Sequence, residues 1–152
     1  MGLDHNLYLV KATSLWRHPD PTLVDGFPLE HQRLLVQQWR CHHWVHQWFC
    51  ANVLEAANEC EEIHVEVEEL AQLADKLEAW VDDPEALPPV SDKLRGAFFG
   101  LRVEDEVYAH VRDSYRAEAK DQAKKIRQAV EWLQVPLRND REHRYATYRA
   151  SW

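Results

Sequence analysis

The chain has few glycines, a single methionine and no long apolar run. Among 152 residues there are four glycines and one methionine. Scarce glycine argues against a loop-rich fold and against a glycine-rich loop that cradles a nucleotide. No segment approaches the ~18 consecutive apolar residues of a membrane-spanning helix, and the first residues, MGLDHNLYLVK, do not resemble a secretory signal. The sequence therefore predicts a cytoplasmic protein with no membrane partner.

Cysteine is scarce as well, and its spacing does not predict a disulfide. The chain has three cysteines, Cys41, Cys50 and Cys60. On the helix predicted below, the first two would lie about 13 Å apart at a rise of 1.5 Å per residue, which is too far for an S–S bond. We therefore expect reduced thiols.

Tryptophan, in contrast, is abundant. Seven tryptophans stand in a chain that is 45% hydrophobic. A chain of this length can bury a proper core, so we expect one compact domain over residues 1–152. The tryptophans predict a core or an interface built from a few large side chains.

The net charge of −8 is unevenly distributed. Twelve acids and a single lysine, Lys76, lie between Glu55 and Glu85. Such a segment attracts basic protein surfaces and repels nucleic acid. One interpretation is a solvated face that keeps the protein in solution. The other is a contact surface that imitates nucleic-acid phosphates and binds a basic partner through Glu55, Glu59, Glu61, Glu62, Glu66, Glu69, Asp82 and Asp83.

The periodicity of apolar residues predicts the fold class. Alternation predicts strands over residues 3–12 and 143–152, and each needs a partner, so we expect these two strands to pair. Steps of three and four predict helices over residues 39–58, 66–81 and 103–133, the last with a possible break near Ser114. The expected fold is α+β, mainly α, with a helical core and a small antiparallel sheet.

The helix over residues 39–58 is expected to be central. Its periodicity begins near Glu30 and is clear from Trp39 onward. Trp44 and Trp48 form a second apolar row, which indicates that the helix is covered on more than one side. The brief alternation after it, at Ile63, Val65 and Val67, is interpreted as a turn.

Four of the tryptophans are more large aromatic side chains than one small helix needs to pack a single face against a core. The set is Trp39, Trp44, Trp48 and Trp132. Core packing explains such a set in most proteins. A homodimer in which Trp44 or Trp132 crosses a two-fold axis would also use these rings, because aromatic side chains dominate the energetics of interfaces.

Histidine and cysteine recur on one face of the same helix. His42, His46 and Cys50 are spaced four residues apart, and both side-chain types bind zinc, with Cys60 or His64 as a further ligand. Yet the outer two would lie about 12 Å apart, so one ion could not bind both. Buried, hydrogen-bonded histidines and an inert thiol are the simpler interpretation. We therefore predict no metal and no cofactor.

The same residues suggest a hydrolytic site as an alternative. Cys50 or Cys41 could act as nucleophile with His46 as base, or Asp105 and Glu106 could exchange protons near His46. No pattern in the sequence locates an oxyanion hole or a lowered thiol pKa. The sequence thus favours a binding protein, with a metal protein or small hydrolase centred on His46 and Cys50 or Asp105 as the alternative, and predicts no catalytic residue.

Five short motifs, in one order along the chain, resemble a family of small, mostly uncharacterised phage and prophage proteins. The motifs are MGLD at Met1–Asp4, Trp39-Arg40 with VHQWF at Val45–Phe49, GAFFG at Gly96–Gly100, DEVY at Asp105–Tyr108 and YRASW at Tyr148–Trp152. The family pattern has a hydrophobic residue at His5, phenylalanine at Ala97 and serine at Ala150.

The resemblance implies an origin in a phage or mobile element and names no activity. Small, acidic, reduced proteins of that origin are similar in character to inhibitors of host defence, anti-CRISPR proteins among them. The resulting hypothesis is a non-enzymatic interaction protein in the host bacterial cytoplasm. Its acidic surface would inhibit a host defence complex, such as a CRISPR surveillance complex or its nuclease.

Overall fold

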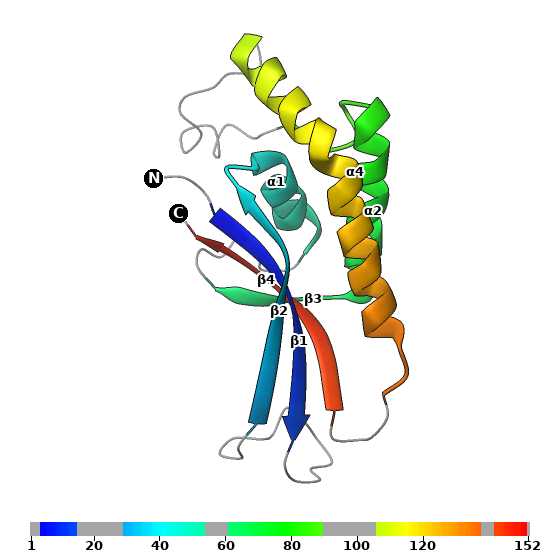
Figure 1. Ribbon diagram of the computed structural model, residues 1–152. Coiled ribbons are helices and arrows are strands. Elements are labelled where there is room, and N and C mark those ends of the chain that lie inside the picture. Colours follow the sequence, from blue (N-terminus) through cyan, green and yellow to red (C-terminus); the bar gives the residue numbers. More distant parts are fainter. Residues whose placement is uncertain (1–3, 15–28, 54–60, 90–105, 138–141, 152) are drawn as a thin grey trace.

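The computed structural model describes residues 4–14, 29–53, 61–89, 106–137 and 142–151. Within them, three helices cover one face of a four-stranded antiparallel sheet (Figure 1). The strands are β1 (Asp4–Ser14), β2 (Leu29–Arg40), β3 (Glu62–Val65) and β4 (Glu142–Ser151), and the helices are α1 (His43–Asn52), α2 (Val67–Asp82) and α4 (Glu106–Gln134). The predicted class, α+β and mainly α, is confirmed.

The strands lie in the order β2-β1-β4-β3. The predicted pairing of the first and last strands is confirmed: β1 and β4 are antiparallel, from Asp4 opposite Ser151 to Thr13 opposite Glu142. Both are therefore inner strands with a partner on each side. The two edges of the sheet are formed by β2 and β3.

The expectation that helical periodicity begins near Glu30 is wrong. Residues 29–40 form strand β2, and the helix begins at His43. The strand contains an irregularity: Leu7 pairs with Gln37 while Tyr8 pairs with Leu35, so Val36 is an extra residue in β2. Such a bulge shifts the inward and outward faces by one position, which hides the period of two.

A sharp corner joins β2 to α1. Cys41 has a φ of 53°, in the left-handed region that non-glycine residues seldom occupy. Its carbonyl accepts hydrogen bonds from the His43 backbone at 3.1 Å and contacts His43 Nδ1 at 2.8 Å. The His42 ring then accepts a hydrogen bond from the Val45 N–H and caps the helix. These contacts hold the chain in an otherwise unfavourable turn.

The prediction that the aromatic helix is central is confirmed for α1. It lies between the upper part of the sheet and the pair α2 and α4 (Figure 1). Phe49 stacks on Tyr148 of β4, with ring centroids 3.8 Å apart. On its other side Trp44 packs against Trp80 of α2 and donates a hydrogen bond to the Tyr108 hydroxyl of α4. Buried side chains from all seven elements form one cluster.

The two longer helices lie side by side (Figure 1). Both were predicted: α2 covers residues 67–82, and α4 runs without a break from Glu106 to Gln134, through Ser114. The stretch at Ile63 and Val65, expected to be a turn, is strand β3. None of the described helices is long and apolar enough to cross a membrane. Glu55, Glu59, Cys60 and Asp105 lie outside the described residues.

Candidate functional site

Helix α2 places its acids and its apolar residues on opposite faces. Leu70, Leu73, Leu77 and Trp80 are buried against α4 and the core. The exposed face carries Glu68, Asp75, Glu78 and Asp82. A stripe of leucine at helical spacing fixes this orientation, since burial of each leucine contributes roughly 2 kcal/mol. The acids are thereby turned toward solvent.

Three of the predicted partner-binding residues have roles inside the chain. The Glu62 carboxylate accepts hydrogen bonds from Arg33 of β2 and from the Thr147 hydroxyl. Glu66 and Glu69 form a capping box at the start of α2, where the Glu69 carboxylate accepts a hydrogen bond from the Glu66 N–H at 2.8 Å. These side chains therefore stabilise β3 and α2, and their predicted role in binding a partner stays a prediction.

Part of the acidic face is neutralised by α4. Arg127 lies 2.6 Å from the Glu78 carboxylate and 2.7 Å from that of Asp75. The hydrogen bonds from Arg127 lower the pKa of Glu78, and in return raise the pKa of the guanidinium. Lys120 and Lys124 line the same shallow hollow on the helix pair. Residues 55–85 contain a single lysine, but in the folded chain the basic side chains of α4 lie against their acids.

The acids that remain lie at the two ends of α2, except Glu61, which precedes β3. Among the described residues, no cation lies within ion-pairing distance of Glu61, Glu68, Asp82, Asp83 or Glu85. Carboxylates at the C-terminal end of a helix oppose its dipole, whereas Glu68 in the first turn is stabilised by it. Arg116 offsets this cost at the C-terminal end, because it donates hydrogen bonds to the carbonyls of Trp80 and Val81, both at 2.7 Å. This arrangement leaves the carboxylates themselves open to solvent.

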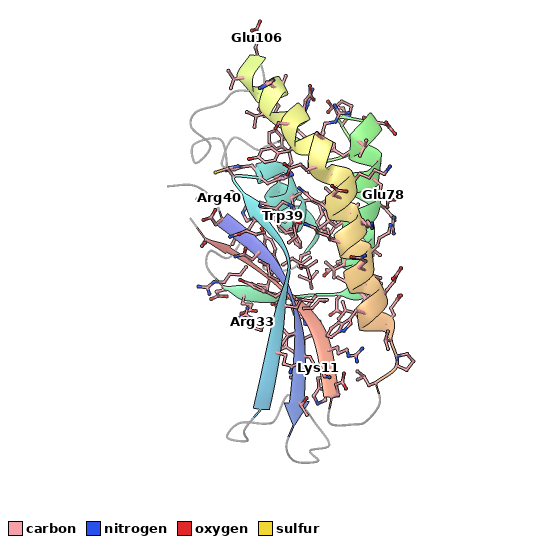
Figure 2. All side chains as sticks on the ribbon, viewed as in Figure 1. Lys11, Arg33, Trp39, Arg40, Glu78 and Glu106 are labelled. Atoms are coloured by element: carbon pink, nitrogen blue, oxygen red, sulfur yellow. The ribbon has the colours of Figure 1, made fainter. Side chains whose placement is uncertain are left out.

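A second group of polar side chains lies inside the protein, beneath α1. Tyr148 of β4 bridges two histidines: its hydroxyl is 2.6 Å from His46 Nδ1 and 3.0 Å from His5 Nδ1. His46 Nε2 in turn lies 3.5 Å from the sulfur of Cys50. His5 stacks on Trp39 of β2, with ring centroids 5.0 Å apart; Figure 2 labels Trp39. One chain of contacts thus links β1, β4 and α1.

Burial holds these groups in their neutral forms. It lowers the pKa of His42 to about 3 and, with a smaller contribution from His43, that of His46 to about 4. It also raises the pKa of the Cys50 thiol and of the Tyr148 hydroxyl. At neutral pH the Cys50–His46 contact joins a thiol to a neutral imidazole. A thiolate nucleophile requires the opposite shift, so this geometry favours a structural role over the hydrolytic alternative.

The metal hypothesis is not supported by the placement of its ligands. His42 stands outside α1 as its cap, while His46 and Cys50 contact each other within the helix. Within the described ranges, no three side chains of His, Cys, Asp or Glu gather closely enough to hold an ion. His42 packs instead against Tyr115, with ring centroids 4.3 Å apart.

The two tryptophans proposed for a dimer contact differ in exposure. Trp44 is 1% exposed, and its ring is covered by Trp80, Tyr108 and Tyr115 of the same chain. It has no surface to offer a second chain, so its proposed role in a dimer is wrong. Trp132 is partly exposed near the end of α4, beside β2.

Sequence reasoning missed His5, Tyr148 and the long edge strand β2. Tyr148 was noted as one of the alternating residues of the last strand, but its partners lie 102 and 143 positions away. No family model, no curated protein and no solved structure matches the chain.

Proposed function

We propose that the protein is a non-enzymatic binding protein whose unpaired carboxylates at the ends of α2 contact a basic surface of a partner. The observation that carries the proposal is the division of the acids into two groups. One group holds the fold together through Arg33, Arg127 and the capping box. The other, Glu61, Glu68, Asp82, Asp83 and Glu85, has no cation within ion-pairing distance among the described residues, although the Asp83 carboxylate accepts a hydrogen bond from the Glu85 N–H at 2.9 Å.

The uncharged histidines of the interior support the proposal that the acids at the surface make the partner contact. The histidines beneath α1 are buried, and aromatic rings surround them on several sides. The ion pair between Arg144 and Glu142 is largely shielded from solvent, whereas the ion pairs of the α2 acids lie at the surface. Exposed carboxylates accelerate association with a basic partner and give an interaction that weakens with salt.

The partner class follows from the resemblance to phage proteins together with the acidic surface. Defence complexes that bind nucleic acid present basic grooves, and DNA carries about one phosphate charge per 1.7 Å along its axis. Carboxylates spaced along α2 can occupy such a groove. The proposed target is a host defence complex, such as a CRISPR surveillance complex or its nuclease.

The test compares two charge-reversed variants of equal net charge. In the first, Glu61, Glu68, Asp82 and Asp83 are each changed to lysine. In the control, the exposed α4 acids Glu106, Glu118, Asp121 and Glu131 are changed to lysine. Each variant is expressed in a bacterial host whose active CRISPR system targets a phage, and the plaques formed by that phage are counted. Circular dichroism verifies that each variant is folded.

We expect the first variant to lose protection of the phage and the control to retain it. Glu62, Glu66 and Glu69 are left unchanged because their carboxylates stabilise the fold. Equal protection by both variants would show that the ends of α2 are not the contact. Absence of protection by the unmodified protein, against every defence system tested, would refute the proposed target.

A further inference from the structure

The two edges of the sheet are built differently. The β3 edge is four residues long and is flanked by Glu61 and Glu66. Short length and charge are the usual protections of an edge strand against pairing with another chain. The β2 edge is 12 residues long and contains no proline and no lysine. At about 3.4 Å per residue it spans about 40 Å.

The middle of β2 exposes both apolar side chains and backbone groups. Leu34 is 64% exposed and Leu35 is 47% exposed, on opposite faces of the strand. Toward the end of the strand, side chains satisfy the backbone: Gln37 donates to the Gln38 carbonyl, and Tyr115 donates to the Arg40 carbonyl. No described side chain does this for the carbonyls of residues 32–36. Apart from the bulge at Val36, this part of the edge, centred on the two leucines, carries none of the usual protections.

The arginines of β2 do not protect this edge from pairing with another strand. The Arg33 guanidinium lies 4.3 Å from the centre of the Tyr8 ring and pairs with Glu62, so it reaches back over the outer face of the sheet (Figure 2). Arg40 pairs with Asp4 of β1 at 3.3 Å. Both cations are thus directed toward the neighbouring strands.

On the helix side, the edge continues into an apolar groove between β2 and α4. Leu34, Leu35 and Val36 of β2 line one side, and Ala129 and Trp132 of α4 line the other. Leu9 of β1 lies at its base, and Lys125 and Gln128 at its rim. A strand added to β2 would place its alternate side chains in this groove.

We propose that two copies of this chain pair through β2, antiparallel, about a two-fold axis perpendicular to the sheet. The pairing would join the two four-stranded sheets into one of eight strands. The grooves would merge, with Leu34 and Trp132 of each copy near the axis. A two-fold contact uses the same surface on both partners, and an antiparallel strand pair meets that condition by itself.

The distribution of charge identifies the occupant as a second copy. A chain of net charge −8 repels its own copies unless the acids point apart. Residues 31–40 of β2 contain no acid. Helix α4 contacts both β2 and α2, so the acidic face of α2 lies across α4 from the proposed interface. The acids flanking β3 would repel a second β3, which directs self-association to β2.

Sedimentation velocity over a wide range of protein concentration tests the proposal. The unmodified chain is expected to form a reversible dimer. Leu34→Lys places like charges next to the axis and is expected to abolish dimer formation. The matched control is Val107→Lys, because Val107 is 57% exposed at the start of α4. It is expected to leave the dimer unchanged.

Hydrogen exchange on the unmodified protein gives a second measurement that needs no variant. Dimer formation is expected to slow the exchange of outward-pointing amides within residues 32–36 as concentration rises, and to leave the β3 amides unchanged. A chain that stays monomeric at all concentrations overturns the proposal. So does a dimer that survives in a folded Leu34→Lys variant, or slowed exchange at β3 instead of β2.

Discussion

The polar side chains on one side of α4 are uncharged, and those on its other side are charged. Toward α1, Tyr115 of α4 packs against His42, whose burial keeps the imidazole neutral. Toward α2, Arg127 of α4 binds two ionised carboxylates in contact with solvent. The same helix thus separates a region whose stability depends on pH from one whose interactions depend on salt.

Acid is expected to have the largest effect, and it acts on the interior side. The folded pKa values of about 3 for His42 and about 4 for His46 lie below the unfolded value of 6.5. The unfolded chain therefore binds more protons below pH 6.5. Stability is fully present above that pH and falls as pH is lowered toward the folded pKa values. At pH 5 His42 and His46 together should cost about 4 kcal/mol. Burial also lowers the pKa values of His5 and His43, so the total loss, measured by urea unfolding at pH 7.5 and pH 5, should be at least that large.

A histidine replacement isolates the contribution of one ring. In His42→Asn the new side chain can still cap α1. The loss between the two pH values should shrink by the His42 contribution of about 2 kcal/mol, while His5, His43 and His46 keep the remainder. The control is His64→Asn, because His64 is exposed on β3. Were the control to remove as much of the pH dependence as His42→Asn, the assignment to buried imidazoles would fail.

Removal of one hydroxyl should have an intermediate effect on the same side. Tyr148→Phe leaves His5 Nδ1 and His46 Nδ1 without their shared partner in the interior. Buried groups without a partner cost about 1–3 kcal/mol, so we expect a loss of about 2 kcal/mol at pH 7.5. Thermal or urea unfolding measures it. Tyr145→Phe, on the opposite face of β4, should change stability by less than about 0.5 kcal/mol.

The smallest effect is expected on the solvent side. Arg127→Ala removes the ion pairs with Asp75 and Glu78, which are exposed. Exposed ion pairs contribute about 1 kcal/mol at most, and salt screens them. The difference from the unmodified protein should be small in dilute buffer and should vanish at high salt. A large loss that persists in salt would mean that Arg127 supports the packing of α2 on α4.

The sequence predicted the elements with regular periodicity and missed the one with a bulge. Helices α2 and α4 and the pairing of β1 with β4 follow from their apolar patterns. Strand β2 was missed because Val36 interrupts its alternation, and because leucine, glutamine and arginine favour helices when considered alone. The four residues of β3 are too few to separate a strand from a turn by pattern.

The candidate site was predicted in part. The sequence shows that acids are concentrated around α2 and that lysine and arginine are nearly absent there. It does not show that Arg127, 49 positions beyond Glu78, lies against them. Nor does it show that Glu62 bonds to residues of β2 and β4. Which carboxylates are engaged within the chain is decided by tertiary contacts, so spacing alone cannot reveal it.

The central position of β1 and β4 has a consequence for synthesis on the ribosome. β1 is synthesised long before one of its two neighbours, which comes from residues 142–151. Until those residues leave the exit tunnel, the nascent chain holds β1 paired at most with β2 and exposes the surface that β4 will cover. Pairing between distant segments of this kind delays folding. We therefore expect the sheet to be completed only after β4 has been synthesised, with chaperones able to bind β1 in the interval.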